Sequence, residues 1–235
     1  TSIHQQKSAS LQLEIPTGSD TKIELQLTRK NFLTDNFIVT ERTASGAQPF
    51  VYQPGVYYQG VVLGEPNSLV AISFFQDKIM AVLSYNGDDH NLGISTNAAK
   101  AEDDVYILYP ESNVLEGNNF ECHTADTPVD VPAEIENNSS GFTTTNNSVK
   151  MYMECDYLMY QDFNNDVTET ADFVTAMFNV VSAVYDIDDV CMELNEVFVW
   201  STQDPYPTSS SNAALDAFES QMNGNFNGDL AHLLS

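Results

Sequence analysis

The chain has 235 residues, of which 42% are hydrophobic and 11% aromatic, so it can bury a core and is not expected to be wholly disordered. Its formal net charge of −26 argues against nucleic acids and anionic membrane surfaces as partners, because both are negatively charged. No run of about 18 apolar residues occurs, so no membrane-spanning helix is expected.

Charge is distributed unevenly along the chain. All eight Lys and Arg residues lie at or before Lys150, and residues 151–235 contain none. Such a change in composition predicts two units with different surfaces. The acidic character is typical of a protein kept soluble in a salty or extracellular setting, and calcium binding is the sharper alternative.

The first 110 residues show the alternation of strands. Apolar and polar side chains alternate with a period of two in several short runs, and turn residues such as Asn86-Gly87 separate the runs. The expected strands are residues 11–15, 23–27, 56–63, 69–75, 78–85 and 105–109. No helical period persists here, so the pattern predicts an all-β antiparallel sandwich or meander.

Residues 124–148 are rich in Thr, Ser, Asn and Pro, which is typical of an exposed linker where proteases cut. The pattern changes after this linker. Residues 149–160 form an apolar run without alternation, as expected of a strand buried on both faces. Further elements are expected as a helix at 168–185, a strand at 190–200, a helix at 211–222 and a strand at 230–234. This order of elements predicts a parallel α/β sheet.

Short motifs follow one another through these elements. They are Cys155-Asp156-Tyr157 at a strand end, Phe178-Asn179-Val180-Val181 on the long helix, Val197-Phe198-Val199-Trp200-Ser201 on the next strand, Asp204-Pro205-Tyr206, and Gly228-Asp229-Leu230-Ala231-His232-Leu233-Leu234-Ser235. The series resembles the N-terminal part of a reprolysin-like (M12) metzincin zinc endopeptidase, most of all the bacterial secreted members. In the first half, Tyr58-Gln59-Gly60-Val61-Val62 and Pro66-Asn67-Ser68-Leu69-Val70-Ala71-Ile72 are similar to motifs of the reprolysin propeptide.

The resemblance implies an α+β protein in three parts. Residues 1–123 would be an all-β antiparallel propeptide domain, residues 124–148 a linker with the processing site, and residues 149–235 the α/β N-terminal part of a metzincin catalytic domain. It further implies a secreted zymogen whose propeptide packs on its own catalytic domain, and an enzyme that hydrolyses protein or peptide substrates with zinc.

The zinc motif of that family, H-E-x-x-H-x-x-G-x-x-H, is absent from the 235 residues. We therefore expect that the chain stops before the active-site helix, that it contains no catalytic residue, and that the fragment itself is inactive although its parent protein is an enzyme.

Cys122 is the candidate zinc-switch residue and the single candidate metal ligand. By the resemblance, a cysteine near the end of the propeptide binds the catalytic zinc and keeps the enzyme latent, since a thiolate is a good zinc ligand. The alternative is a plain free or disulfide-bonded cysteine, because the count of three cysteines is odd. His123 is more simply a solvent-exposed loop residue.

The other metal-ligating side chains have structural interpretations. Cys155 and Cys191 are expected at opposite ends of neighbouring parallel strands, too far apart for a disulfide, as two buried thiols. His232 is expected to be a strand residue. Residues 162–166 resemble the start of a calcium loop, but the required glycine and glutamate are missing, so a helix-capping loop is favoured.

Two other functions stay open at this point. The chain could be a non-enzymatic secreted acidic binding or adhesion protein, in which calcium would matter more than zinc. It could also be a free propeptide-like inhibitor that acts on a separate protease through Cys122. A buried final strand would favour the first of these alternatives, and an open groove beside it would favour the protease hypothesis.

Overall fold

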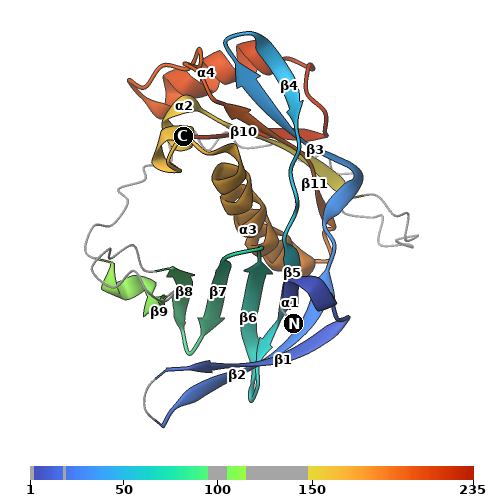
Figure 1. The fold of residues 1–235 in the computed structure, drawn as a ribbon, viewed down its shortest axis with the longest axis vertical. Helices are drawn as coiled ribbons and strands as arrows, with labels where there is room; N and C mark the ends of the chain where they lie inside the picture. Colours follow the sequence, from blue (N-terminus) through green and yellow to red (C-terminus); the bar gives the residue numbers. More distant parts are fainter. Residues whose placement is uncertain (1–2, 18–19, 95–104, 115–147) are drawn as a thin grey trace, which may run out of the picture.

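The computed structural model describes residues 3–17, 20–94, 105–114 and 148–235. They form an α+β fold in which helix α3 (Val167–Asp186) lies between two β-sheets (Figure 1). The main hydrophobic core joins α3 to both sheets. Helix α4 (Ser211–Met222) packs through Phe218 on the outer face of the second sheet, against Trp200 and Tyr206. No described helix is both long enough and apolar enough to cross a membrane.

The first sheet is antiparallel, with the strand order β1-β2-β5-β6-β7-β8-β9. Its strands are β1 (Ser10–Pro16), β2 (Lys22–Lys30), β5 (Val56–Val62), β6 (Glu65–Phe74), β7 (Ile79–Tyr85), β8 (Asp88–Ile94) and β9 (Tyr106–Pro110). The expected hairpin turn is present, since Asn86 and Gly87 both have positive φ between β7 and β8. The strands expected from the sequence are therefore present in this sheet, but β8 was not among them.

The two faces of the first sheet bury different side chains because successive residues of a strand point in opposite directions. One face carries Tyr58, Ile72 and Leu83, all fully buried in a core of their own, against which Ile3 of α1 (Ile3–Gln6) packs. The opposite face turns toward α3. Gly60 permits the close approach of β2 and β5, because a Cβ atom there would lie 2.0 Å from the carbonyl oxygen of Gln26.

The second sheet has the order β12-β10-β11-β3-β4. Its strands are β3 (Leu33–Thr43), β4 (Gly46–Phe50), β10 (Val149–Cys155), β11 (Met192–Trp200) and β12 (Leu230–Leu234). Strands β12, β10, β11 and β3 are parallel, and β4 runs antiparallel to β3. The predicted α/β sheet is thus present, but a hairpin from the first half of the chain, which the alternation pattern does not predict, extends it.

The interpretation of residues 149–160 as one buried strand was wrong, whereas the strand end expected at Cys155-Asp156-Tyr157 is confirmed. Residues 149–160 are not a single strand, because β10 ends at Cys155 and helix α2 (Tyr157–Asp162) follows at once. The carboxylate of Asp156 accepts a hydrogen bond of 2.7 Å from the backbone N–H of Met159 and so caps this helix. The capping aspartate stops the strand, although the apolar run continues through the helix.

The expected helix-capping loop at 162–166 is confirmed. The carboxylate of Asp166 accepts hydrogen bonds from the backbone N–H groups of Thr168 and Glu169, and α3 begins at the next residue. Helix α4 is capped in the same way by Ser210. A short 3-10 helix, Glu111–Asn113, follows β9.

Candidate functional site

The described residues 3–114, called here the N-terminal segment, meet residues 148–235, the C-terminal segment, along β11 and α3 (Figure 1). This contact, the intersegment interface, is the candidate functional site. Its central feature is the parallel pairing of β3 with β11, in which Val39 lies opposite Val197 and Arg42 opposite Trp200. Backbone hydrogen bonds therefore make one continuous sheet from two distant parts of the chain.

Side chains reinforce the pairing of β3 with β11. The Thr40 hydroxyl donates a hydrogen bond of 2.7 Å to the Glu196 carboxylate, and both side chains are buried. The Thr34 hydroxyl donates to the side-chain oxygen of Asn195 at 2.6 Å. Such buried polar pairs fix the register of a sheet, because a slip would leave each group without its partner.

Phe32 anchors the interface just before β3. Its ring lies 4.6 Å from the ring of Tyr57 in the first sheet and 5.3 Å from the ring of Phe178 in α3. Phe178 is fully buried, and Phe32 is 4% exposed. This aromatic cluster joins both sheets to the helix through apolar contact.

An ionic cluster forms the second contact with α3. Lys78 follows β6, and its ammonium group lies 2.9 Å from the Asp172 carboxylate and also contacts Glu169. The Tyr52 hydroxyl donates a hydrogen bond of 2.7 Å to the other oxygen of Asp172. The side chains of Lys78 and Asp172 are 10% and 6% exposed, so this ion pair is shielded from water.

The pKa values in this cluster reflect burial and pairing. Burial opposes the charge on Lys78, but the hydrogen bonds with Glu169 and Asp172 outweigh it and raise the pKa of Lys78. Burial raises the pKa of Asp172, although Lys78 and Tyr52 act in the opposite direction. Removal of Lys78 would leave a buried carboxylate without its counter-charge.

A buried amide pair forms the third contact. The Gln59 amide of β5 donates to the side-chain oxygen of Asn179 at 3.1 Å and to the Ser182 hydroxyl at 2.7 Å. The Asn179 amide in turn donates to the backbone carbonyl of Ile72 and to the Ser73 hydroxyl, each at 3.2 Å. Asn179 is fully buried, so its polar groups depend on these partners from the first sheet.

The sequence motifs contained these residues but not their roles. Gln59 and Asn179 both lie in motifs that carry the family resemblance, yet nothing in the motifs shows that they bond to each other. The available signal was Asn179, a polar residue inside the apolar stripe of α3, because a buried amide needs a hydrogen-bond partner.

Cys122, the candidate zinc-switch residue, and His123 lie outside the described residues. Cys155 and Cys191 are free thiols at opposite ends of β10 and β11, as expected. Cys155 is fully buried, and burial raises the pKa of its thiol. Cys191 is exposed, so the prediction of a second buried thiol was wrong: it precedes the first residue of β11 and escapes the core.

His232 lies on β12 opposite Met153, as the strand prediction expected, and burial lowers the pKa of its imidazole. The residues present do not fit a catalytic zinc ion. In the part of the chain that the structure describes, no three His, Cys, Asp or Glu side chains are grouped as a metal site would require. What the described interface does show is a set of contacts that hold the two segments together.

Comparison with known families matches residues 145–235 to the reprolysin family model described as Metallo-peptidase family M12. The matched region contains β10, α2, α3, β11, α4 and β12, which is the part to which the N-terminal segment is bound. By this match, residues 145–235 are similar to the reprolysin-like metallopeptidases of family M12, which suggests a protease-related protein.

Proposed function

We propose that the chain belongs to the zymogen of a secreted zinc-dependent metalloendopeptidase, and that residues 1–123 are its propeptide. The observation that carries the proposal is the parallel pairing of β3 with β11, which joins the N-terminal segment to the M12-like region by a shared sheet. A segment that adds strands to the sheet of another region binds that region through main-chain hydrogen bonds.

Three of the contacts of the intersegment interface support this role directly. The shared sheet, the Lys78–Asp172 ion pair and the Gln59–Asn179 amide pair all join residues before 114 to residues after 148. A cut in residues 124–148 would leave these contacts intact. Activation therefore requires two steps in this proposal, which are cleavage of the linker and release of the N-terminal segment.

Zinc chemistry belongs to the whole enzyme in this proposal. Members of family M12 generally use zinc to activate a water molecule for peptide hydrolysis. Since no H-E-x-x-H motif occurs in the 235 residues, none of them is assigned a catalytic step. Cys122 keeps its proposed role as the residue whose thiolate binds the zinc and holds the enzyme latent.

The proposal is tested on the protein as its native source produces it. Before linker cleavage, we expect about one zinc per chain and no hydrolysis of a casein substrate. After cleavage and release of the N-terminal segment, hydrolysis should appear and should be abolished by a chelator. A native product that never binds zinc or cleaves protein would overturn the proposal.

Cys122→Ser tests the latency mechanism separately. If the thiolate holds the zinc, this variant should hydrolyse casein before linker cleavage, whereas Cys191→Ser, the matched control, should stay latent. Equal latency of the two variants would remove Cys122 from the mechanism and leave the propeptide role of the segment untouched.

A further inference from the structure

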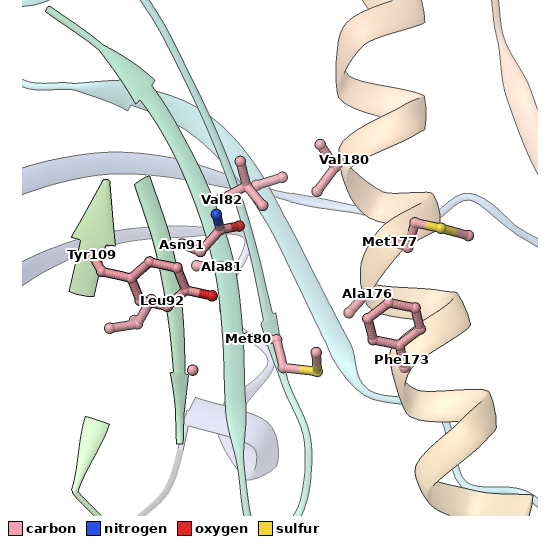
Figure 2. A pocket seen from close by; sticks show the side chains of 12 residues that line it. Met80, Ala81, Val82, Asn91, Leu92, Tyr109, Phe173, Ala176, Met177 and Val180 are labelled. Atoms are coloured by element: carbon pink, nitrogen blue, oxygen red, sulfur yellow. The ribbon is translucent and has the colours of Figure 1, made fainter. Parts of the chain in front are cut away.

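A cavity of about 360 Å³ lies between the first sheet and α3 (Figure 2). Met80 and Val82 of β7 extend toward the helix, and Ala176 and Val180 of α3 extend toward the sheet. Its walls thus come from both segments of the chain. The volume falls within the range of small-molecule sites in proteins.

The register of the first sheet explains the position of the cavity. Ala71, Val82, Asn91 and Tyr109 are cross-strand partners on β6, β7, β8 and β9, so their side chains share the face that turns toward α3. Within the first sheet, helix α3 packs mainly on β6 and less on β5. Strands β8 and β9 lie beyond the helix, and no described residue fills the space above this row of side chains.

The residues that line the cavity indicate which kind of molecule it can bind. Although the net charge of the chain is −26, none of the described residues that line the cavity is charged. Two lining groups are polar, the Asn91 amide and the Tyr109 hydroxyl, and neither side chain has a hydrogen-bond partner among the described residues. They lie opposite each other on neighbouring strands. Two flexible methionines, Met80 and Met177, complete the apolar wall.

We propose that this cavity is a binding site for a small uncharged molecule with an apolar, ring-sized body and one hydroxyl or carbonyl group. The body lies between β7 and α3, and the polar group bonds to Asn91 and Tyr109. Because the ligand touches both segments, its binding also stabilises their association. Binding itself does not depend on the propeptide role proposed above.

The methionines provide reporters for a direct test. The chain has seven methionines, and only Met80 and Met177 line the cavity. With 13C-labelled methionine methyl groups, 2-naphthol is titrated into the full chain and the NMR shifts are followed. We expect saturable shifts of Met80 and Met177 alone. The charged analogue 2-naphthalenesulfonate should bind at least about tenfold more weakly, because its charge would be desolvated without a partner.

Gly93→Leu provides the blocking variant. Gly93 lies on the same face of β8 as Asn91, and a Cβ atom there would meet nothing within 4 Å, so we expect a leucine side chain to extend into the cavity. We expect the Kd of 2-naphthol to rise at least about tenfold. Ser84→Leu, which adds the same side chain outside the cavity, should leave the Kd unchanged.

The remaining outcomes are also decisive. Asn91→Ala keeps the apolar volume but removes the polar partner. It should therefore weaken the binding of 2-naphthol and leave the binding of naphthalene unchanged. Shifts spread over all seven methionines, equal binding of the sulfonate, or an unchanged Kd in Gly93→Leu would each overturn the proposal. If Gly93→Leu does not fold, the methionine shifts and Asn91→Ala decide the question.

Discussion

The two sheets of this protein are assembled in different ways. In the first sheet, neighbouring strands also follow each other along the chain, except for β2 and β5. In the second sheet, β3 and β11 are neighbours although they lie far apart in the chain, and Thr40 and Glu196, whose side chains share a hydrogen bond, are 156 positions apart. The first sheet is specified by local pattern, whereas the second depends on the intersegment interface.

This difference matters for function because the M12-like region contains β10, β11 and β12, but the outer edge of β11 is covered by β3. An uncovered strand edge exposes unpaired N–H and C=O groups, with which other chains can pair. The N-terminal segment therefore protects that edge as long as it stays bound. Substitutions in the shared sheet and at the contacts with α3 distinguish how much each contributes to stability.

The largest effect is expected from Val39→Asp. Val39 is 2% exposed at the centre of the β3–β11 pairing, so the variant buries a charge without a partner. We expect the free energy of unfolding to fall by about 4 kcal/mol, as measured by urea denaturation. Ile38→Asp, at a 41% exposed position on the same strand, should cost much less. Equal losses would show that the pairing contributes little.

Lys78→Met should lower the free energy of unfolding by about 3 kcal/mol at neutral pH, because Asp172 loses its counter-charge. The raised pKa of Lys78 means that its contribution is present below the ordinary value of 10.5 and is lost as pH rises through the folded pKa. The pKa of Asp172 is raised above 3.8, so at acid pH this carboxyl takes up a proton and the difference between variant and wild type should shrink.

Urea denaturation of Lys78→Met between pH 4 and about pH 11 checks this pH dependence. The double variant Lys78→Met/Asp172→Asn is the control, because it removes the buried charge and should recover most of the lost stability. A pH-independent loss, unaffected by the second substitution, would assign the effect to packing.

Asn179→Ala should lower the free energy of unfolding by about 2 kcal/mol, because the Gln59 amide and the Ser73 hydroxyl lose buried partners. The change should be smaller in a Gln59→Leu background, where one of those partners has already been removed. A double-mutant cycle measures this coupling, and full additivity would mean that the two amides act independently.

The smallest effect is expected from Thr40→Val. It should lower the free energy of unfolding by about 1 kcal/mol, because it removes one hydrogen bond to the Glu196 carboxylate and keeps the side-chain shape. Thermal unfolding of the variant, compared with Thr43→Val at a half-buried position of β3, tests it. A greater loss in the control variant would show that the buried bond to Glu196 has no special weight.

The contrast between the sheets also explains what could be predicted from the sequence. Alternation and turn residues predicted the strands of the first sheet other than β8, and the capping loop at 162–166 predicted the start of α3, because these signals lie within a few residues of the element. Residues 33–50 carry no such signal: β3 is buried mainly at Val39 and Thr40, and its other side chains are at least partly exposed. Its partner β11 lies far away in the chain.

The site was harder to predict than the fold for the same reason. Lys78, Gln59 and Asn179 are ordinary residues in isolation, and only the packing of α3 against the first sheet brings them to their partners. The cap at Asp156 could have been found from sequence, since an aspartate directly before an apolar run is a helix-start signal. The apolar run after it favoured the longer strand.

The most direct test of the shared-sheet account is to introduce a specific protease site within residues 124–148, cut the folded chain there, and follow both pieces by size-exclusion chromatography. The account predicts that the two pieces of the otherwise unchanged chain elute together, and that they separate when Val39→Asp is present. Separation of the unchanged pieces without denaturant would contradict it.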